Sequence, residues 1–261
     1  LVWLNKLPVG FTADEAGQGY AAYSLLKTGK DEWGQWWPLF PRGFGDYKAP
    51  LYTWLTIPSV AAFGLSAWSV RLPEVILGTL AVVAVYFLAK ELFQEKVAIW
   101  AALLLAISSW AVQLSRNAWE GGVGILFFTL GWYWWLKNKP LVAALAFGIN
   151  LYSYHSWRLV TGAFVLWLLI RRGKKFSWKA AAVFGILALP VVFNLKQTLA
   201  RAGDVSIISS QNITSYFANK GTSAAPYWVA KLLDNKYIYV ANQFWYNYTT
   251  YFTPTFFFTG N

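Results

Sequence analysis

Long apolar runs separated by short charged segments dominate the chain between residues 58 and 195. The runs lie near residues 70–89, 97–115, 119–136, 140–154, 156–170 and 180–195. A helix that crosses a bilayer needs about 20 mostly apolar residues, whereas helices of a soluble core are amphipathic. The pattern therefore predicts an all-α fold, in which residues 58–195 form a polytopic bundle of transmembrane helices.

Residues 140–170 allow two arrangements. They could form one long tilted helix, or two short spans that turn at Tyr152–Arg158, although halves of about 15 residues are shorter than a usual span. Clusters of Lys and Arg flank this segment at residues 137–139 and 171–179. Because such clusters mark cytoplasmic loops, both ends should lie on the cytoplasmic side. This favours the two-span hairpin.

The segments on either side of the bundle are too polar to span a bilayer. Residues 1–57 hold five of the eleven acids together with many aromatic residues, so we expect an extracytoplasmic loop with interfacial helices, one of them over Asp14–Lys27. Residues 196–261 should form a second extracytoplasmic loop that leads to a further, truncated span. The chain starts at Leu1 and contains no Met, so we interpret it as a fragment cut at both ends.

The formal net charge of +11 raises the question of a nucleic-acid partner. The basic residues do not form one stripe but sit as short clusters between apolar runs, which is typical of topology signals. We therefore expect the lipid bilayer as a partner and no nucleic acid. With no Cys and one His, a zinc site is improbable, and the sequence requires no cofactor, while a divalent cation stays open.

Polar side chains gather at the predicted outer ends of the spans, where they should converge near one membrane face. Acids beside cations, surrounded by aromatic residues, suit a substrate with a lipid tail in the bilayer and a phosphate at its surface. Lys and Arg would bind the phosphate, and a carboxylate would act as general base. The residues concerned are Asp14, Glu15, Asp46, Tyr47, Lys48, Arg71, Arg116, Glu120, Tyr154, His155 and Arg158.

Each of these residues also has a purely structural interpretation. Asp14 and Glu15 could be acids in the first turn of a helix capped by Thr12. Arg71 and Arg116 could be interfacial anchors, and His155 could be a hydrogen-bonded buried residue. The combination of these residues is more informative than any one of them.

Several segments resemble bacterial members of the protein O-mannosyltransferase-like family, which are polyprenyl-phosphate-sugar-dependent glycosyltransferases with the GT-C fold. The resemblance is most specific in the first loop and extends over nearly the whole chain. It is carried by residues 11–34, by Gly45-Asp46-Tyr47-Lys48-Ala49-Pro50-Leu51-Tyr52, by Val70-Arg71-Leu72-Pro73, by Ser115-Arg116-Asn117, by residues 152–158 and by residues 251–258.

The resemblance implies site roles at matching positions. Asp14 matches the catalytic base and Glu15 its acidic neighbour, while Lys48 matches the lysine of a Lys-Pro-Pro-like element that binds the donor phosphate. This chain has Ala49 where that element often has its first Pro. Further predicted contacts are Arg158, by analogy, and Arg116 to the donor phosphate, and Asp46, Tyr47, Tyr154, His155 and Arg71 to the substrate.

We therefore predict a membrane glycosyltransferase that takes a monosaccharide from a polyprenyl-phosphate donor, with inversion, and gives it to a protein, lipid or glycan acceptor. It should lie in the bacterial cytoplasmic membrane with its active site on the extracytoplasmic face. A transporter or flippase for a lipid-linked or anionic substrate is the alternative, and a non-catalytic scaffold is a third. A transporter would more often place charges at mid-membrane, whereas here they lie at span ends.

Overall fold

The computed structural model of the chain is mostly helical and divides into two units, Leu1–Thr198 and Leu199–Asn261. It describes residues 3–6, 8–43, 46–171, 177–195, 197, 213–216 and 235–253. The first unit contains α1 (Ala13–Thr28), α2 (Pro50–Phe63), α3 (Ala67–Leu92), α4 (Glu95–Ile107), α5 (Ser109–Arg116), α6 (Glu120–Leu136), α7 (Pro140–Asn150), α8 (His155–Ile170) and α9 (Trp178–Phe193). The second contains α13 (Lys236–Thr250).

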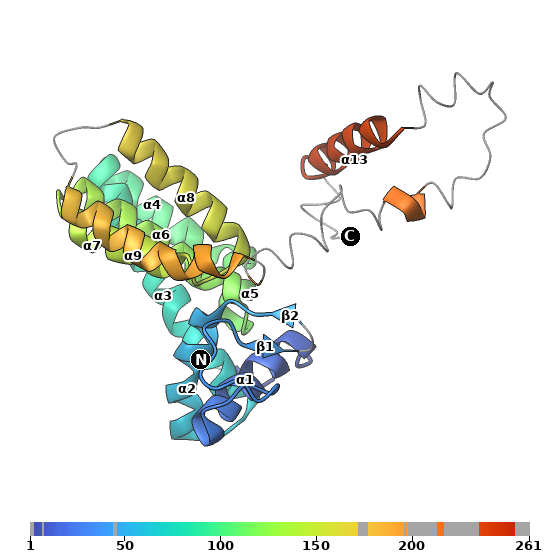
Figure 1. Cartoon of the computed structure of the whole chain (residues 1–261). Helices are drawn as coiled ribbons and strands as arrows, with labels where there is room; N and C mark the ends of the chain where they lie inside the picture. Colours follow the sequence, from blue (N-terminus) through green and yellow to red (C-terminus); the bar gives the residue numbers. More distant parts are fainter. Residues whose placement is uncertain are drawn as a thin grey trace, which may run out of the picture. The chain divides into compact units, whose positions relative to one another are not determined.

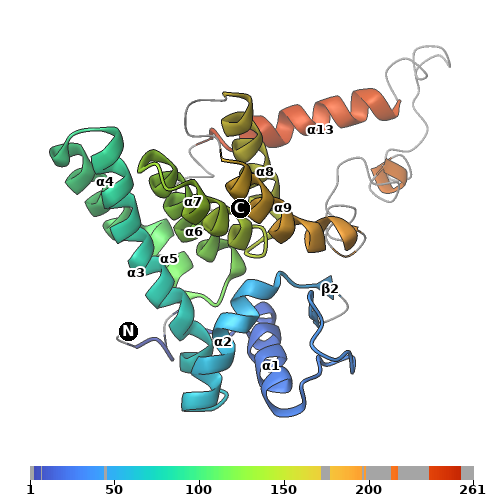
Figure 2. The same cartoon turned by 60° about the vertical axis from the view of Figure 1, so that its left-hand side comes forward.

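The first unit has a small helical layer at one end of α3 and a helical bundle farther along it (Figures 1 and 2). In the small layer, α1 and α2 pack against each other and against α3, next to a two-stranded antiparallel sheet of β1 (Arg42–Gly43) and β2 (Asp46–Tyr47). In the bundle, α3 packs on α4 and α6, α6 packs on α7, and α7 packs on α9. Residues from the first loop are thereby brought to the ends of the apolar helices.

Local sequence signals account for the bounds of α1 and α2. Thr12 caps α1 in a capping box with Glu15, and the helix stops at Gly29, whose φ of 68° is a left-handed conformation that glycine adopts without strain. Pro50 starts α2 as its first residue. This helix continues to Phe63, so it runs across the boundary predicted at residue 57.

Of the apolar helices described, α3 is the one that is long and apolar enough by itself to cross a bilayer. The run predicted as one span over residues 97–115 forms two helices, α4 and α5, which are bent by 58° and which together are long and apolar enough to cross a bilayer. The bend lies at Ser108, which is extended and whose hydroxyl accepts a hydrogen bond from the amide of Ala111. The first amides of a helix have no acceptor within that helix, and a serine side chain can accept from one of them. A new helix can therefore start directly after Ser108.

Residues 140–170 form two helices, as the hairpin prediction requires. α7 ends at Asn150 and α8 begins at His155, and α7, α8 and α9 are all shorter than a usual span. A buried polar cluster ties the turn together, because the Asn150 amide donates to Thr161 Oγ1 at 2.9 Å and the Ser153 hydroxyl donates to the Asn150 carbonyl at 2.7 Å. The membrane orientation of these helices stays a prediction.

The predicted second loop, residues 196–261, lies largely outside the described residues, and so does the truncated span expected at its end. Within it the structure describes residues 213–216 and α13, which Asn235 caps by accepting from the amides of Tyr237 and Ile238. Residues 172–176 of the basic cluster at residues 171–179 are also outside the described part.

Candidate active site

An exposed carboxylate and a buried ammonium group form an ion pair in the candidate site. Asp14 lies in the first turn of α1, and Lys48 lies between β2 and α2. Lys48 Nζ is 2.7 Å from Asp14 Oδ1, although the two residues are 34 positions apart in sequence. The Asp14 side chain is 61% exposed, whereas that of Lys48 is 8% exposed. The carboxylate can therefore meet a substrate while its partner is held by the protein.

Glu15 and Arg71 form a second ion pair that is entirely buried. Arg71 Nε is 2.6 Å from Glu15 Oε1, and Arg71 Nη2 is 3.0 Å from Glu15 Oε2. The guanidinium also donates to the carbonyls of Leu4, Pro8 and Gly10. Its donors are thus occupied by the protein, and the geometry favours a positioning role for Arg71 in place of the predicted substrate contact.

Glu15 itself connects three parts of the chain. Besides Arg71 it accepts hydrogen bonds from the amides of Thr12 at 2.9 Å and Ala118 at 3.2 Å. It therefore ties α1 to α3 and to the turn before α6. A carboxylate with so many donors is poorly suited to take a proton from a substrate, so Glu15 is better interpreted as the residue that orients the helix carrying Asp14.

The pKa of Glu15 reflects this environment. Burial raises it, but the hydrogen bonds from Arg71, Thr12 and Ala118 and the charge of Arg71 outweigh that effect and hold the pKa below its ordinary value of 4.5. A carboxyl group whose pKa is lowered on folding stabilises the folded state above its unfolded pKa. That contribution is lost as the pH falls through the lowered value.

We therefore expect a pH-dependent difference between the wild type and Glu15→Gln. Above pH 4.5 the wild type should be more stable, because only the carboxylate pairs with Arg71. Below pH 4.5 the difference should shrink as Glu15 takes up a proton. Melting temperatures of both proteins between pH 3 and pH 7 measure this, and a difference that is constant across the range would contradict the assignment.

Glu120, at the start of α6, contacts residues close to both Asp14 and Lys48. It is 5% exposed, accepts from the Gln18 amide of α1, and accepts from the backbone amide of Ala49 at 3.2 Å. Gln18 in turn accepts from the Thr53 hydroxyl of α2. A proline at position 49 would lack the N–H that Glu120 uses, so the alanine found here is matched to this network.

Arg158 lies in the first turn of α8. Its Nε donates to the Leu151 carbonyl at 3.0 Å, its Nη1 is 2.9 Å from His155 Nδ1, and its guanidinium lies over the Phe40 ring at 5.2 Å. Tyr152 of the same turn accepts at its carbonyl from the amide of Leu51, so the α7–α8 turn contacts α2 three residues after Lys48.

The remaining predicted site residues lie in α5, in β2 and directly before α8. The Tyr154 ring contacts Trp119 and His155, with ring centres 5.5 and 5.7 Å apart. Arg116 ends α5, two residues before Ala118. Tyr47 lies in β2, with its ring centre 5.9 Å from the Arg42 guanidinium, and Asp46 pairs through its backbone with Gly43 while its side chain lies outside what the structure describes.

A family model for dolichyl-phosphate-mannose-protein mannosyltransferases matches residues 47–195, which is more than half of the chain. The chain belongs to this family. The matched residues of this mannosyltransferase family member include Lys48, Arg71, Glu120 and Arg158, whereas Asp14 precedes them.

The chain is also 28% identical over 185 residues to the Bacillus subtilis (strain 168) protein named "Putative mannosyltransferase YycA". That alignment covers 66% of this chain and 26% of the relative, so the chain spans about a quarter of the relative's length. No solved structure matches the chain significantly.

Two residues of the candidate site were not predicted from the sequence. Gln18 lies four residues after Asp14, hence on the same side of α1, and that spacing was a usable signal. Phe40, beside Arg158, had no such signal because its contact depends on the path of the first loop.

Among the residues that the structure describes, no three His, Asp or Glu side chains are grouped so that they could hold a metal ion.

Proposed function

We propose that the full protein containing this chain is a membrane glycosyltransferase that takes a mannose-type sugar from a polyprenyl-phosphate donor. The family membership supports this reaction class, and the observation that carries the proposal is the contact between the exposed Asp14 carboxylate and the buried Lys48 ammonium. The acceptor is a hydroxyl group of a protein, lipid or glycan. The enzyme works at the extracytoplasmic face of the bacterial cytoplasmic membrane.

In this mechanism Asp14 and Lys48 act on different parts of the reaction. Lys48 binds the donor phosphate, and Asp14 takes the proton from the acceptor hydroxyl. The acceptor oxygen then attacks the anomeric carbon while the bond from that carbon to the phosphate oxygen breaks. The products are an inverted glycoside and polyprenyl phosphate, whose negative charge stays paired with Lys48.

Donor binding also changes the environment of Asp14, because Lys48 and Asp14 are in contact before the donor arrives. Because Lys48 already pairs with Asp14 at 2.7 Å, an arriving phosphate competes with the carboxylate for the same ammonium group. Donor binding thereby weakens the ion pair between Lys48 and Asp14, which makes the Asp14 carboxylate a better proton acceptor. Arg158 is the second cation proposed for the phosphate, and Glu15, Arg71 and Glu120 hold the elements that carry these groups.

The test is a transfer assay on the full-length protein in lipid nanodiscs with radiolabelled polyprenyl-phosphate mannose. We expect Lys48→Met to lower kcat/KM for the donor by roughly ten- to a hundredfold, because a hydrogen bond to a charged group contributes about 1.5–3 kcal/mol. The matched control is Lys96→Met, at the exposed start of α4, which should leave kcat/KM unchanged.

Two results would count against the proposal. Equal kcat/KM in wild type and Lys48→Met would remove Lys48 from donor binding. In sealed proteoliposomes, labelled lipid that crosses the membrane with its sugar still attached would favour the transporter instead.

A further inference from the structure

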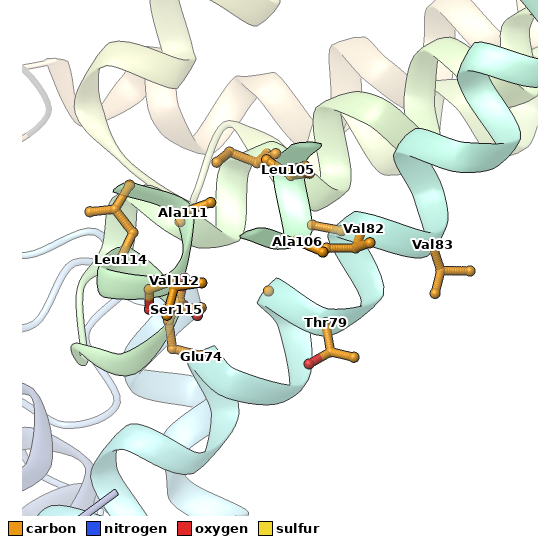
Figure 3. A pocket seen from close by; sticks show the side chains of 14 residues that line it. Glu74, Thr79, Val82, Val83, Leu105, Ala106, Ala111, Val112, Leu114 and Ser115 are labelled. Atoms are coloured by element: carbon orange, nitrogen blue, oxygen red, sulfur yellow. Dashed lines mark hydrogen bonds between the residues drawn. The ribbon is translucent and has the colours of Figure 1, made fainter. Parts of the chain in front are cut away.

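A cavity of about 350 Å³ lies between α3, α4, α5 and α6, at the bend between α4 and α5. Valine, leucine, alanine and isoleucine make up most of its walls, and Figure 3 shows α3 on one side and the α4–α5 segment on the other. Val83 and Val112 on the walls are 47% and 41% exposed. The cavity is therefore open to whatever surrounds the apolar helices, which for helices in a bilayer is hydrocarbon.

One acidic side chain of this cavity has no use in the site described above. Glu74 is 1% exposed, and its Oε2 has no hydrogen-bond partner among the described residues. Its other carboxyl oxygen packs against Gly122, where any larger residue would collide with it. A buried polar atom without a partner is costly, so a carboxyl group kept in an apolar cavity calls for a ligand.

The cavity lies directly next to the carboxylate network of the candidate active site. Glu74 follows Arg71 by three residues on α3, so the two lie on the same side of that helix. Ser115, also on the cavity wall, precedes Ala118, whose amide binds Glu15. A ligand in the cavity would thus touch elements that also position Asp14.

We propose that this cavity binds a single-chain amphiphile with a hydroxyl end group, the hydroxyl being hydrogen-bonded to the carboxyl group of Glu74 and the chain lying along the apolar walls. A volume of about 350 Å³ falls in the lower part of the range usual for small-molecule sites. A carboxyl group donates and accepts, which a hydroxyl group matches on both counts. The apolar walls disfavour an ionic head group, because a charge taken out of water is costly.

The test uses dicyclohexylcarbodiimide on the full-length protein in lipid nanodiscs, with mass spectrometry of the peptide that contains Glu74. This apolar reagent takes the carboxyl proton on one nitrogen and the carboxyl oxygen on its central carbon, and an acyl shift then leaves a stable N-acylurea. We expect Glu74 to be labelled faster than Glu91 and Glu95, which are exposed. Glu74→Gln removes the label.

The ligand class is tested by protection. 1-Dodecanol should slow labelling of Glu74 about fivefold more than dodecane at the same concentration, which corresponds to one hydrogen bond of about 1 kcal/mol. Ala106→Phe places a ring on the cavity wall and should abolish labelling, whereas Leu104→Phe, on the same helix but outside the cavity, should leave it unchanged.

Three outcomes would overturn the inference. Glu74 could stay unlabelled in protein whose melting temperature is normal, which would mean that another part of the full chain fills the cavity. Equal protection by dodecane and 1-dodecanol would remove Glu74 as the recognition group. Labelling of Glu74 at the wild-type rate in Ala106→Phe would show that an apolar molecule does not reach Glu74 through this cavity. None of these results depends on whether the protein transfers sugar.

Discussion

Asp14→Asn should lower kcat for sugar transfer by about 10²–10⁴-fold, the range usual for loss of a general base. Asparagine keeps the size of aspartate and can still accept a hydrogen bond from Lys48, but its amide cannot take the proton of the acceptor hydroxyl. The Asp14 side chain is 61% exposed and asparagine keeps an acceptor for the buried Lys48 ammonium group, so the stability should change little. Transfer from radiolabelled donor, measured beside the melting temperature, checks both parts.

Glu32→Gln is the sharpest comparison for this variant. The Glu32 carboxylate and the aliphatic part of the Lys48 side chain both lie within about 4 Å of the position that a Cβ on Gly43 would occupy, so Glu32 is a second acid close to the Lys48 side chain. We expect Glu32→Gln to keep most of the activity. If Glu32→Gln lost activity while Asp14→Asn kept it, the base would be Glu32, and equal wild-type rates in both would leave the mechanism without a base in the first loop.

Arg71→Leu should destabilise the protein by about 3–5 kcal/mol, the usual cost of removing one partner from a buried ion pair. The change leaves the Glu15 carboxylate without a cation and deprives the carbonyls of Leu4, Pro8 and Gly10 of a donor. The N-terminal segment would then lose its attachment to α3. Urea unfolding of the full-length protein in detergent measures the difference in free energy of unfolding.

Two further variants separate a positioning role from a substrate contact. The double variant Glu15→Gln/Arg71→Leu should lower the free energy of unfolding by less than the sum of the two single changes. Each single change leaves one buried charge without its partner, whereas the double change removes both charges. Arg171→Met, at the exposed end of α8, should change the free energy of unfolding by less than about 0.5 kcal/mol. A fully stable Arg71→Leu protein with a raised KM for donor would instead make Arg71 a substrate contact.

The helices could be predicted from the sequence because their signals are local. Thr12 and Gly29 bound α1, Pro50 starts α2, and the polar turn after Asn150 separates two apolar helices. Each signal acts within a few residues, through capping or a fixed backbone angle, so no tertiary contact is needed to recognise it. The break at Ser108 was missed because an apolar run continues on both sides of it.

The sequence also indicated which ionisable residues would gather near the ends of the apolar helices, since acids and cations recur where apolar runs begin. Which groups each of them contacts was decided by tertiary packing alone. Asp14 meets Lys48 across 34 positions, Glu15 meets Arg71 across 56 and Gln18 meets Glu120 across 102. An arginine that binds a substrate and one that binds backbone carbonyls look the same in a sequence, because the difference lies in which surface the folded chain places against the guanidinium.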